Sequence, residues 1–324
     1  MPPRQAEPLA AVPAGASTRS DVIRARLFLV VLCLGWGTTW PMMRIALSEI
    51  PPFSMRVGSL ALGAVTLTSL ALMQGRSLRI PNLRTWSHLC AASLFNIVAF
   101  SIFTPFAQLA ADTSRVAIVV YTMPIWATLL ARPVLGERLT ATRTVALLLC
   151  IGGMAVLTYP LAALAVPTGI LLALGAAVSW AAGTVYLKWA RLDGDPMAAA
   201  VWQVVIGFLI IGALLPVVEG GLHLAQAHTA AILALIFAGV IGSGISYFLW
   251  FDIVRRLPAA TASLGVLSSP VVGVVTSVLI LGERPTLADI AGFALMLAAS
   301  ACVLLRPHDA VRRPRDRPHA RRAA

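Results

Sequence analysis

Polar side chains inside long apolar stretches are the residues of this sequence whose chemistry needs an explanation. Asn96 and Tyr247 are large hydrogen-bonding side chains in otherwise apolar runs, and Arg56 is a basic side chain inside such a run. Polar groups in an apolar environment have a desolvation cost unless they find partners, so they mark either helix–helix hydrogen bonds or a binding site. A guanidinium at position 56 offers a docking charge for a carboxylate, or it reaches outward to water along its aliphatic stem.

Aromatic and smaller polar residues extend this set of binding candidates. Trp36 and Trp180 lie deep in their apolar runs, where they form walls for an uncharged or aromatic group or pack in the core. The other polar or aromatic candidates for contact with a small solute are Thr39, Trp40, Tyr121, Thr184 and Gln203.

Prolines inside the apolar runs are the third kind of candidate. A proline within a helix removes a backbone donor and frees the carbonyl four residues earlier, which an apolar surrounding tolerates only where another group satisfies it. We expect Pro124 and Pro270 to be mid-helix prolines that line a central cavity, with a packing kink as the alternative. Pro41 and Pro105 are further prolines of this kind.

Catalytic and metal-binding patterns do not appear. The sequence has no HExxH, GxSxG or nucleotide-binding motif, so we expect neither an enzyme nor a bound cofactor. The four cysteines show no CxxC spacing and resemble small core residues. No Asp, Glu or His falls near the middle of an apolar run, which favours a facilitator or exchanger over strict proton coupling. Glu137 and Glu283, beside Arg138 and Arg284, are expected to pair locally or to cap the next helix.

Composition defines the environment that must position these residues. The chain is 59% hydrophobic and 12% charged, with a mean hydropathy of +0.86, whereas a soluble domain carries about 25% charged residues. Lipid is the solvent that suits such a chain, so we expect the bilayer as its partner. The net charge of +12 does not indicate nucleic-acid binding, because the basic residues cluster between apolar runs and in the tails rather than among aromatics.

Ten runs are long enough to cross a bilayer, which needs about 20 mostly apolar residues. They are Leu27–Leu47, Pro52–Met73, Trp86–Ala107, Ser114–Leu135, Thr142–Tyr159, Thr168–Lys188, Met197–Val218, Thr229–Phe251, Ala259–Leu281 and Leu287–Leu305. With the amino terminus inside, nearly all Lys and Arg residues fall in inner segments, and the outer connections hold Arg44, Arg115 and Arg284. By the positive-inside rule, both termini are cytoplasmic.

An internal repeat relates the two halves. Leu135-Gly136-Glu137-Arg138 recurs as Leu281-Gly282-Glu283-Arg284, and at the same spacing Pro124 corresponds to Pro270. Near the start of each half, Trp36 corresponds to Trp180, although Ala181 stands where the first half has Gly37. Five spans per half is an odd number, so the second copy must be inverted in the membrane, an architecture common among secondary transporters. The fold we predict is therefore an all-α membrane protein with ten transmembrane helices in two inverted five-helix repeats.

These motifs together resemble the EamA-type branch of the drug/metabolite transporter superfamily. The matching pieces are Leu34-Gly35-Trp36-Gly37, Pro51-Pro52 with Arg56, Ser179-Trp180, Trp202-Gln203, Tyr247-Phe248-Leu249-Trp250, and the two Leu-Gly-Glu-Arg segments. The resemblance implies a carrier that exports amino acids or related small metabolites, often from a bacterial inner membrane, through a central cavity. A membrane scaffold, a receptor without transport, or a membrane-embedded enzyme remains the alternative. The oligomeric state is open.

The same pattern divides the chain into four parts. We expect a polar cytoplasmic tail over residues 1–26, a first five-helix repeat over 27–159, a second, inverted repeat over 160–305, and a basic cytoplasmic tail over 306–324.

Overall fold

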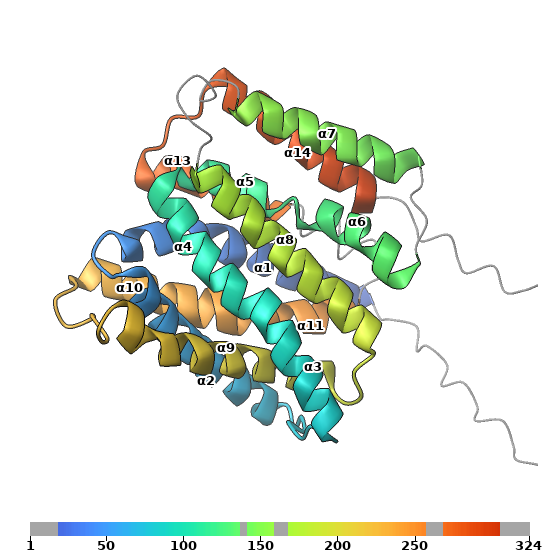
Figure 1. The fold of residues 1–324 in the computed structure, drawn as a ribbon, viewed down its shortest axis with the longest axis vertical. Helices are drawn as coiled ribbons and strands as arrows, with labels where there is room; N and C mark the ends of the chain where they lie inside the picture. The colour runs from blue at the N-terminus through green and yellow to red at the C-terminus, as the bar shows by residue number, and fades with distance from the viewer. Residues whose placement is uncertain (1–18, 137–140, 159–167, 257–267, 305–324) are drawn as a thin grey trace, which may run out of the picture.

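The structure of the protein is a computed structural model that describes residues 19–136, 141–158, 168–256 and 268–304 (Figure 1). Helices make up these ranges, and no β-strand occurs within them. The first half contains α1 (Arg19–Leu47), α2 (Pro52–Met73), α3 (Leu83–Ser93), the π-helix η1 (Leu94–Ala99), α4 (Phe100–Ala110), α5 (Thr113–Val120), α6 (Met123–Leu135) and α7 (Ala141–Thr158). The second contains α8 (Thr168–Ala190), α9 (Pro196–Val218), α10 (Thr229–Phe237), the π-helix η3 (Ala238–Ile245), α11 (Ser246–Arg256), α13 (Ser268–Leu281) and α14 (Leu287–Leu304).

Membrane-spanning length is reached by seven helical segments of the described residues. They are Leu27–Leu47, Pro52–Met73, Leu83–Ala110, Thr113–Leu135, Thr168–Ala190, Pro196–Val218 and Thr229–Trp250. Three shorter apolar helices accompany them: Thr144–Val156, Ser268–Leu281 and Leu287–Ala299. The seven agree with seven of the ten expected spans to within a few residues. The other three expected spans meet the shorter helices, so the count of ten stays a prediction.

Two of the spans contain a π-helical segment in their middle. The segment η1 separates α3 from α4, and η3 separates α10 from α11. A π turn carries an extra residue, which widens the turn and disturbs the regular hydrogen-bond ladder, and such turns recur at functional sites. Each π-helix lies in the third span of its half, so the two halves share the feature. The apolar periodicity alone did not predict it.

The fourth span is also interrupted. The α-helix α5 ends at Val120, a turn at Tyr121 and Thr122 follows, and α6 begins at Met123. Pro124 is therefore one of the first two residues of α6 rather than a mid-helix proline, and our expectation for it was wrong. At that position the missing N–H has no intrahelical partner to lose, and the fixed φ suits the start of a helix. Pro41 and Pro105 do lie inside helices, as expected.

Helix packing joins the two halves throughout the bundle. The helices α2 and α9 pack together, and so do α7 and α14, the last described helix of each half (Figure 1). The first helix of each half packs on helices of the other half: α1 contacts α11 and α13, while α8 contacts α4 and α6. The interior is thus built from both halves rather than from two separate cores.

The pair α2–α9 is antiparallel and held at both ends. Arg76, after the end of α2, forms a 2.8 Å ion pair with Asp195, the N-cap residue of α9. Burial alone would raise the pKa of Asp195, but the hydrogen bonds from Arg76 and the Met197 N–H outweigh it and hold that pKa below its usual value. At the other end, Glu219 contacts the beginning of α2.

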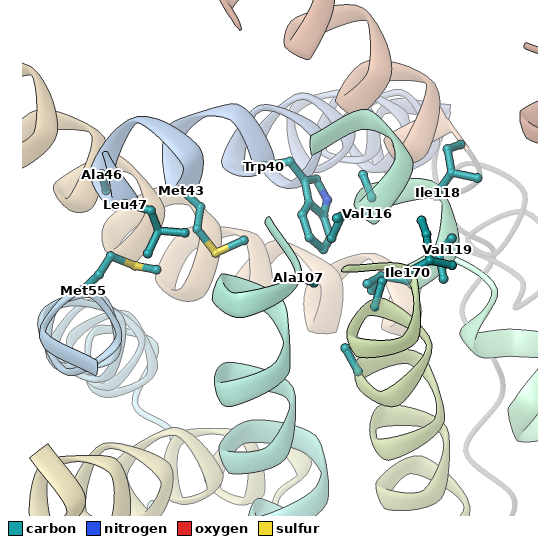
Figure 2. Packing of buried hydrophobic residues seen from close by; sticks show 14 of the residues in the cluster. Trp40, Met43, Ala46, Leu47, Met55, Ala107, Val116, Ile118, Val119 and Ile170 are labelled. Atoms are coloured by element: carbon teal, nitrogen blue, oxygen red, sulfur yellow. The ribbon is translucent and has the colours of Figure 1, made fainter. Parts of the chain in front are cut away.

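Trp40 anchors the largest cluster of buried apolar side chains. It is 7% exposed and projects from α1 toward Ala107 of α4 and Val116 of α5 (Figure 2). Its ring centroid lies 6.2 Å from that of Tyr121 in an edge-on arrangement. Gln108 donates from Nε2 to the Trp40 carbonyl at 3.1 Å. We therefore assign Trp40 and Tyr121 to the packed interior that joins α1, α4 and α5.

Candidate functional site

Four aromatic side chains from four different helices meet in the interior of the bundle. They are Trp36 on α1, Phe100 on α4, Trp180 on α8 and Tyr247 on α11, and we call them the aromatic cage. The ring centroids of Phe100 and Trp180 are 5.0 Å apart, those of Trp180 and Tyr247 6.2 Å, and those of Tyr247 and Trp36 6.0 Å. Both halves contribute two rings, and the repeat-related residues Trp36 and Trp180 both contact Tyr247. The sequence suggested Trp36 and Trp180 as walls for a solute, and their role in binding stays a prediction.

The π-helix η3 fixes one wall of the cage. The Trp36 indole N–H donates to the carbonyl of Gly242 at 3.2 Å, so a backbone acceptor of the π-helix is satisfied by a cage residue. Thr39, one turn later on α1, also faces this residue: a Cβ at Gly242 would lie 2.6 Å from its hydroxyl oxygen. Gly242 therefore allows α1 to approach η3 closely enough for the indole to reach the carbonyl.

Arg56 lies beside the cage and is bound by neutral partners. Its Nε donates to the Ser101 carbonyl at 3.1 Å, and one terminal nitrogen donates to the Thr104 hydroxyl. Pro105 has no N–H with which to bond the Ser101 carbonyl, so the guanidinium replaces the missing helical donor. Val57, the next residue along α2, packs against the same buried apolar cluster as Tyr247 of the cage.

Asn96 and Gln203 form a buried pair between η1 and α9. They are 7% and 8% exposed, and Asn96 Nδ2 donates to Gln203 Oε1 at 3.0 Å. Asn96 lies on η1 and packs directly on α8, where a Cβ at Gly183 would be 2.1 Å from its Oδ1. Within the described residues, that Oδ1 accepts no hydrogen bond. The pair thus ties η1 to α9 and leaves little room for a solute there.

The Asn96–Gln203 pair carries a testable coupling energy. We expect a double-mutant cycle of Asn96→Leu and Gln203→Leu to give a coupling of about 0.6 kcal/mol and at most roughly 1.7 kcal/mol, the range of helix–helix hydrogen bonds in membranes. The measurement is reversible unfolding of the purified protein in mixed micelles. Additive effects of the two substitutions would contradict an energetic link.

Two further expected site residues take no part in the ring contacts of the cage. Thr184 is exposed on α8 and donates to the Trp180 carbonyl of its own helix at 2.9 Å. Pro270 is buried near the start of α13. The structure therefore brings Trp36, Trp180 and Tyr247 together, with Thr39 and Arg56 beside them. The expected residues with other contacts are Asn96, Gln203, Trp40, Tyr121, Thr184, Pro124 and Pro270.

At one end of the bundle, three carboxylates bind helices of one half to helices of the other, a role that the sequence did not predict for them. Glu219, after α9, accepts from the backbone N–H groups of Phe53 and Ser54 at 2.7 and 2.8 Å. Glu283, after α13, accepts from the N–H groups of Thr113 and Ser114 at 2.6 and 3.0 Å. We call this end of the bundle the capped end.

The third carboxylate is Glu49, after α1. It accepts from the His228 backbone N–H at 2.6 Å, and that bond, followed by the contact with the His228 ring, holds the pKa of Glu49 below its usual value. Each carboxylate follows a helix of one half and caps the N-terminus of a helix in the other half, where free N–H groups and the helix dipole favour an anion.

Glu283 therefore differs from our expectation. It caps α5, a helix of the other half, rather than the next helix or its neighbour Arg284. The nearby ion pair of Arg115 with Asp289, 2.6 Å between Nε and Oδ1, joins the same two halves. Sequence reasoning missed these links because a partner more than a hundred residues away leaves no local signal. Glu137, the repeat counterpart of Glu283, lies outside the described residues.

A family comparison covers most of the chain. The model of the EamA-like transporter family matches residues 23–159 and, a second time, residues 167–305. The same unit is therefore recognised once in each half.

Relatives extend over nearly the full length. The chain is 27% identical over 281 residues to "Uncharacterized transporter YoaV" of Bacillus subtilis, covering 85% of this chain and 94% of that protein. It is 25% identical over 276 residues to "Probable terminal-alkyne amino-acid exporter" of Streptantibioticus cattleyicolor, covering 83% and 90%. A solved crystal structure matches with a TM-score of 0.60 at 23% identity over 89% of this chain and 98% of that chain, which shows a shared fold.

Proposed function

The chain belongs to the EamA-like transporter family, and from that premise we propose that it exports amino acids or related small metabolites by alternating access. It is a multi-pass membrane protein with several apolar helices. Its partners in this proposal are the lipid bilayer and a small organic solute. The relative named as an amino-acid exporter supports this solute class.

The observation that carries the proposal is the aromatic cage. Its rings come from both halves and from four helices, so a relative movement of the halves changes the shape of the cage. A solute held between Trp36 and Trp180 therefore binds at a place whose exposure depends on how the halves are arranged. A scaffold, a receptor or an embedded enzyme is the alternative; the family and the names of the relatives favour transport.

We further propose that the halves are inverted repeats of five spans each, with both termini in the cytoplasm of a bacterial cell and the capped end outside. The distribution of basic residues supports this orientation. The antiparallel packing of α2 and α9, second helices of their halves, supports the inversion. The parts over 1–26, 27–159, 160–305 and 306–324 remain our assignment of the tails and repeats.

Counterflow into liposomes tests the function directly. Vesicles with purified protein and a high internal concentration of unlabelled leucine or phenylalanine should take up external labelled amino acid faster than protein-free vesicles. A facilitator or exchanger needs no proton gradient, so collapsing ΔpH should leave the rate unchanged. Equal uptake with and without protein, for all amino acids and a panel of related metabolites, would contradict the proposal.

The capped end provides a second test of the proposed function. Its carboxylates bind helices of one half to helices of the other, and these contacts must break when the site opens to the outside. We expect Glu283→Gln to favour opening, since a neutral amide accepts the two N–H bonds from Thr113 and Ser114 roughly half as strongly as the carboxylate. A cysteine at Ala107, which is 0% exposed beneath this end, should then react several-fold faster with an impermeant thiol reagent in a background without the native cysteines.

The matched control is Asp193→Asn, which removes an exposed acidic charge between α8 and α9, at the opposite end of α9 from Glu219. It should leave the labelling rate unchanged. Equal rates for Glu283→Gln and the parent protein would show that the carboxylate does not hold the halves together.

A further inference from the structure

Arg56 is a cation inside a membrane span whose described partners are all neutral. A guanidinium has five N–H donors. The bonds to the Ser101 carbonyl and the Thr104 hydroxyl use two of the donors of Arg56, so others are available to a further partner. No ion pair joins it to a carboxylate within the ranges that the structure describes, whereas Arg115 is paired with both Asp289 and Asp112. The charge of Arg56 is therefore uncompensated by the described part of the chain.

The carbonyl released by Pro105 does not explain the charge. That carbonyl needs a donor, and a neutral glutamine or serine would provide one. Arg56 is the fifth residue of the span that begins at Pro52, and a guanidinium there has a desolvation cost smaller than the roughly 2.5–3.5 kcal/mol of a central position. Only an anionic partner makes use of the positive charge, and the polar neighbours of Arg56 hold the guanidinium in a fixed orientation to receive it.

A narrow hollow lies beside the guanidinium, between α2, α4 and α9, and Arg56, Ser101 and Ile211 are among its lining residues. In this conformation it is too narrow to hold a water molecule, so a carboxylate reaches Arg56 only when these helices move apart. The remaining lining residues are Pro52, Phe53, Ile102 and Phe106, so the walls are otherwise apolar. Tyr247 of the aromatic cage packs against the same buried cluster as Phe53 and Ile211, two lining residues of this hollow.

We propose that Arg56 binds the carboxylate of the transported solute, while the aromatic cage holds the apolar part of the same molecule. This inference rests on the proposed transport function and narrows its solute class to small organic carboxylates with an apolar body. A guanidinium suits a carboxylate because it donates parallel, charge-assisted hydrogen bonds to the two oxygens. Gln203, the approximate counterpart of Arg56 in the second half, is neutral and accepts a hydrogen bond from Asn96. Of these two positions, only the one in the first half therefore offers a charge that can bind a carboxylate.

Matched ligand pairs that differ in the carboxylate test the inference. Tryptophan fluorescence of the purified protein is titrated with phenylalanine and phenylalaninamide, leucine and leucinamide, and 3-phenylpropanoate and 3-phenylpropanamide. The parent protein should bind the carboxylate of at least one pair about ten times more tightly than its amide. Arg56→Gln should weaken that carboxylate by about 10- to 100-fold and leave the amide nearly unchanged, the loss expected for a hydrogen bond to a charged group.

Two further variants separate docking from packing. Arg44→Gln is the matched control, because Arg44 also donates to a backbone carbonyl of α4, that of Gln108, and it should keep the carboxylate preference. In a Pro105→Ala background the helix regains an N–H for the Ser101 carbonyl, so a purely structural Arg56 becomes dispensable. Arg56→Gln should still abolish the carboxylate preference in that background.

The binding and transport measurements test the role of Arg56 and the transport function separately. A parent protein without carboxylate preference in any pair, or an Arg56→Gln variant that keeps it, overturns the role of Arg56. Restoration of the preference in the Pro105→Ala background would show that Arg56 only supports α4. Counterflow by the parent protein in any of these cases leaves the transport function standing. Conversely, Arg56-dependent binding without counterflow of any solute would refute transport and leave the binding site intact.

Discussion

Substituting Gly37 by valine is expected to destabilise the protein by about 3 kcal/mol, near the upper end for overpacking of a filled interior. A Cβ at Gly37 would lie 2.6 Å from the Val272 Cβ and 2.9 Å from the Ser269 carbonyl oxygen. The first of these atoms is fixed to the backbone of α13 and the second is part of it, so neither moves aside by a rotamer change. The substitution must push α1 away from α13 and disturb Trp36, the neighbouring cage residue.

Thermal or denaturant unfolding in detergent, followed by fluorescence, measures this effect. Gly212→Ala on α9 is the matched control, because the Cβ of an alanine there would meet no heavy atom within 4 Å among the described residues. It should be neutral or stabilise by up to about 1 kcal/mol through helix propensity. If Gly37→Val proved as stable as the control, the close approach of α1 and α13 would be incorrect.

Removal of the Tyr247 ring is expected to lower counterflow about 100-fold. Tyr247 is the residue through which Trp36 and Trp180 are connected, with ring centroids 6.0 and 6.2 Å away. Tyr247→Ala loses both aromatic contacts and leaves a void at the centre of the cage, and loss of a large buried ring costs about 3–5 kcal/mol. A 100-fold change in binding corresponds to about 2.8 kcal/mol, so an effect of this order follows if most of that cost falls on solute binding.

Tyr247→Phe keeps the ring and should retain counterflow within a few-fold. Protein amount and monodispersity are measured in parallel, because a core role alone would lower yield and transport together. A Tyr247→Ala protein that folds in good yield and exchanges solute at the normal rate would remove the aromatic cage from the transport pathway.

The two halves use the same framework for different chemistry. Trp36 and Trp180 correspond in the repeat and both contact Tyr247, yet Arg56 and Gln203, approximate counterparts, do not act alike. Gln203 closes a packing contact with Asn96, and Arg56 stays next to a hollow. Gly37 and Ala181 show the same divergence: the close contact with α13 excludes a side chain at Gly37, whereas the buried Ala181 accommodates its methyl group.

Sequence alone determined the class of the protein and most of its helices. Few charges, long apolar runs and short polar connections allow no other solvent than lipid for most of the surface, because unpaired backbone groups cannot remain in hydrocarbon. The repeat was readable because both copies keep the Leu-Gly-Glu-Arg segment and the tryptophan. The aromatic candidates Trp36, Trp180 and Tyr247 were found by their depth in these runs.

Tertiary structure decided which polar and aromatic residues meet. The apolar pattern of a span reports burial but not the neighbour on the next helix, so it could not distinguish Trp36 in the cage from Trp40 in the packed core. Nor could it place Pro124 at a helix start, introduce π turns at η1 and η3, or bring Glu283 to the N-terminus of α5. These features depend on contacts between residues distant in the chain, which exist only once the two halves have packed together.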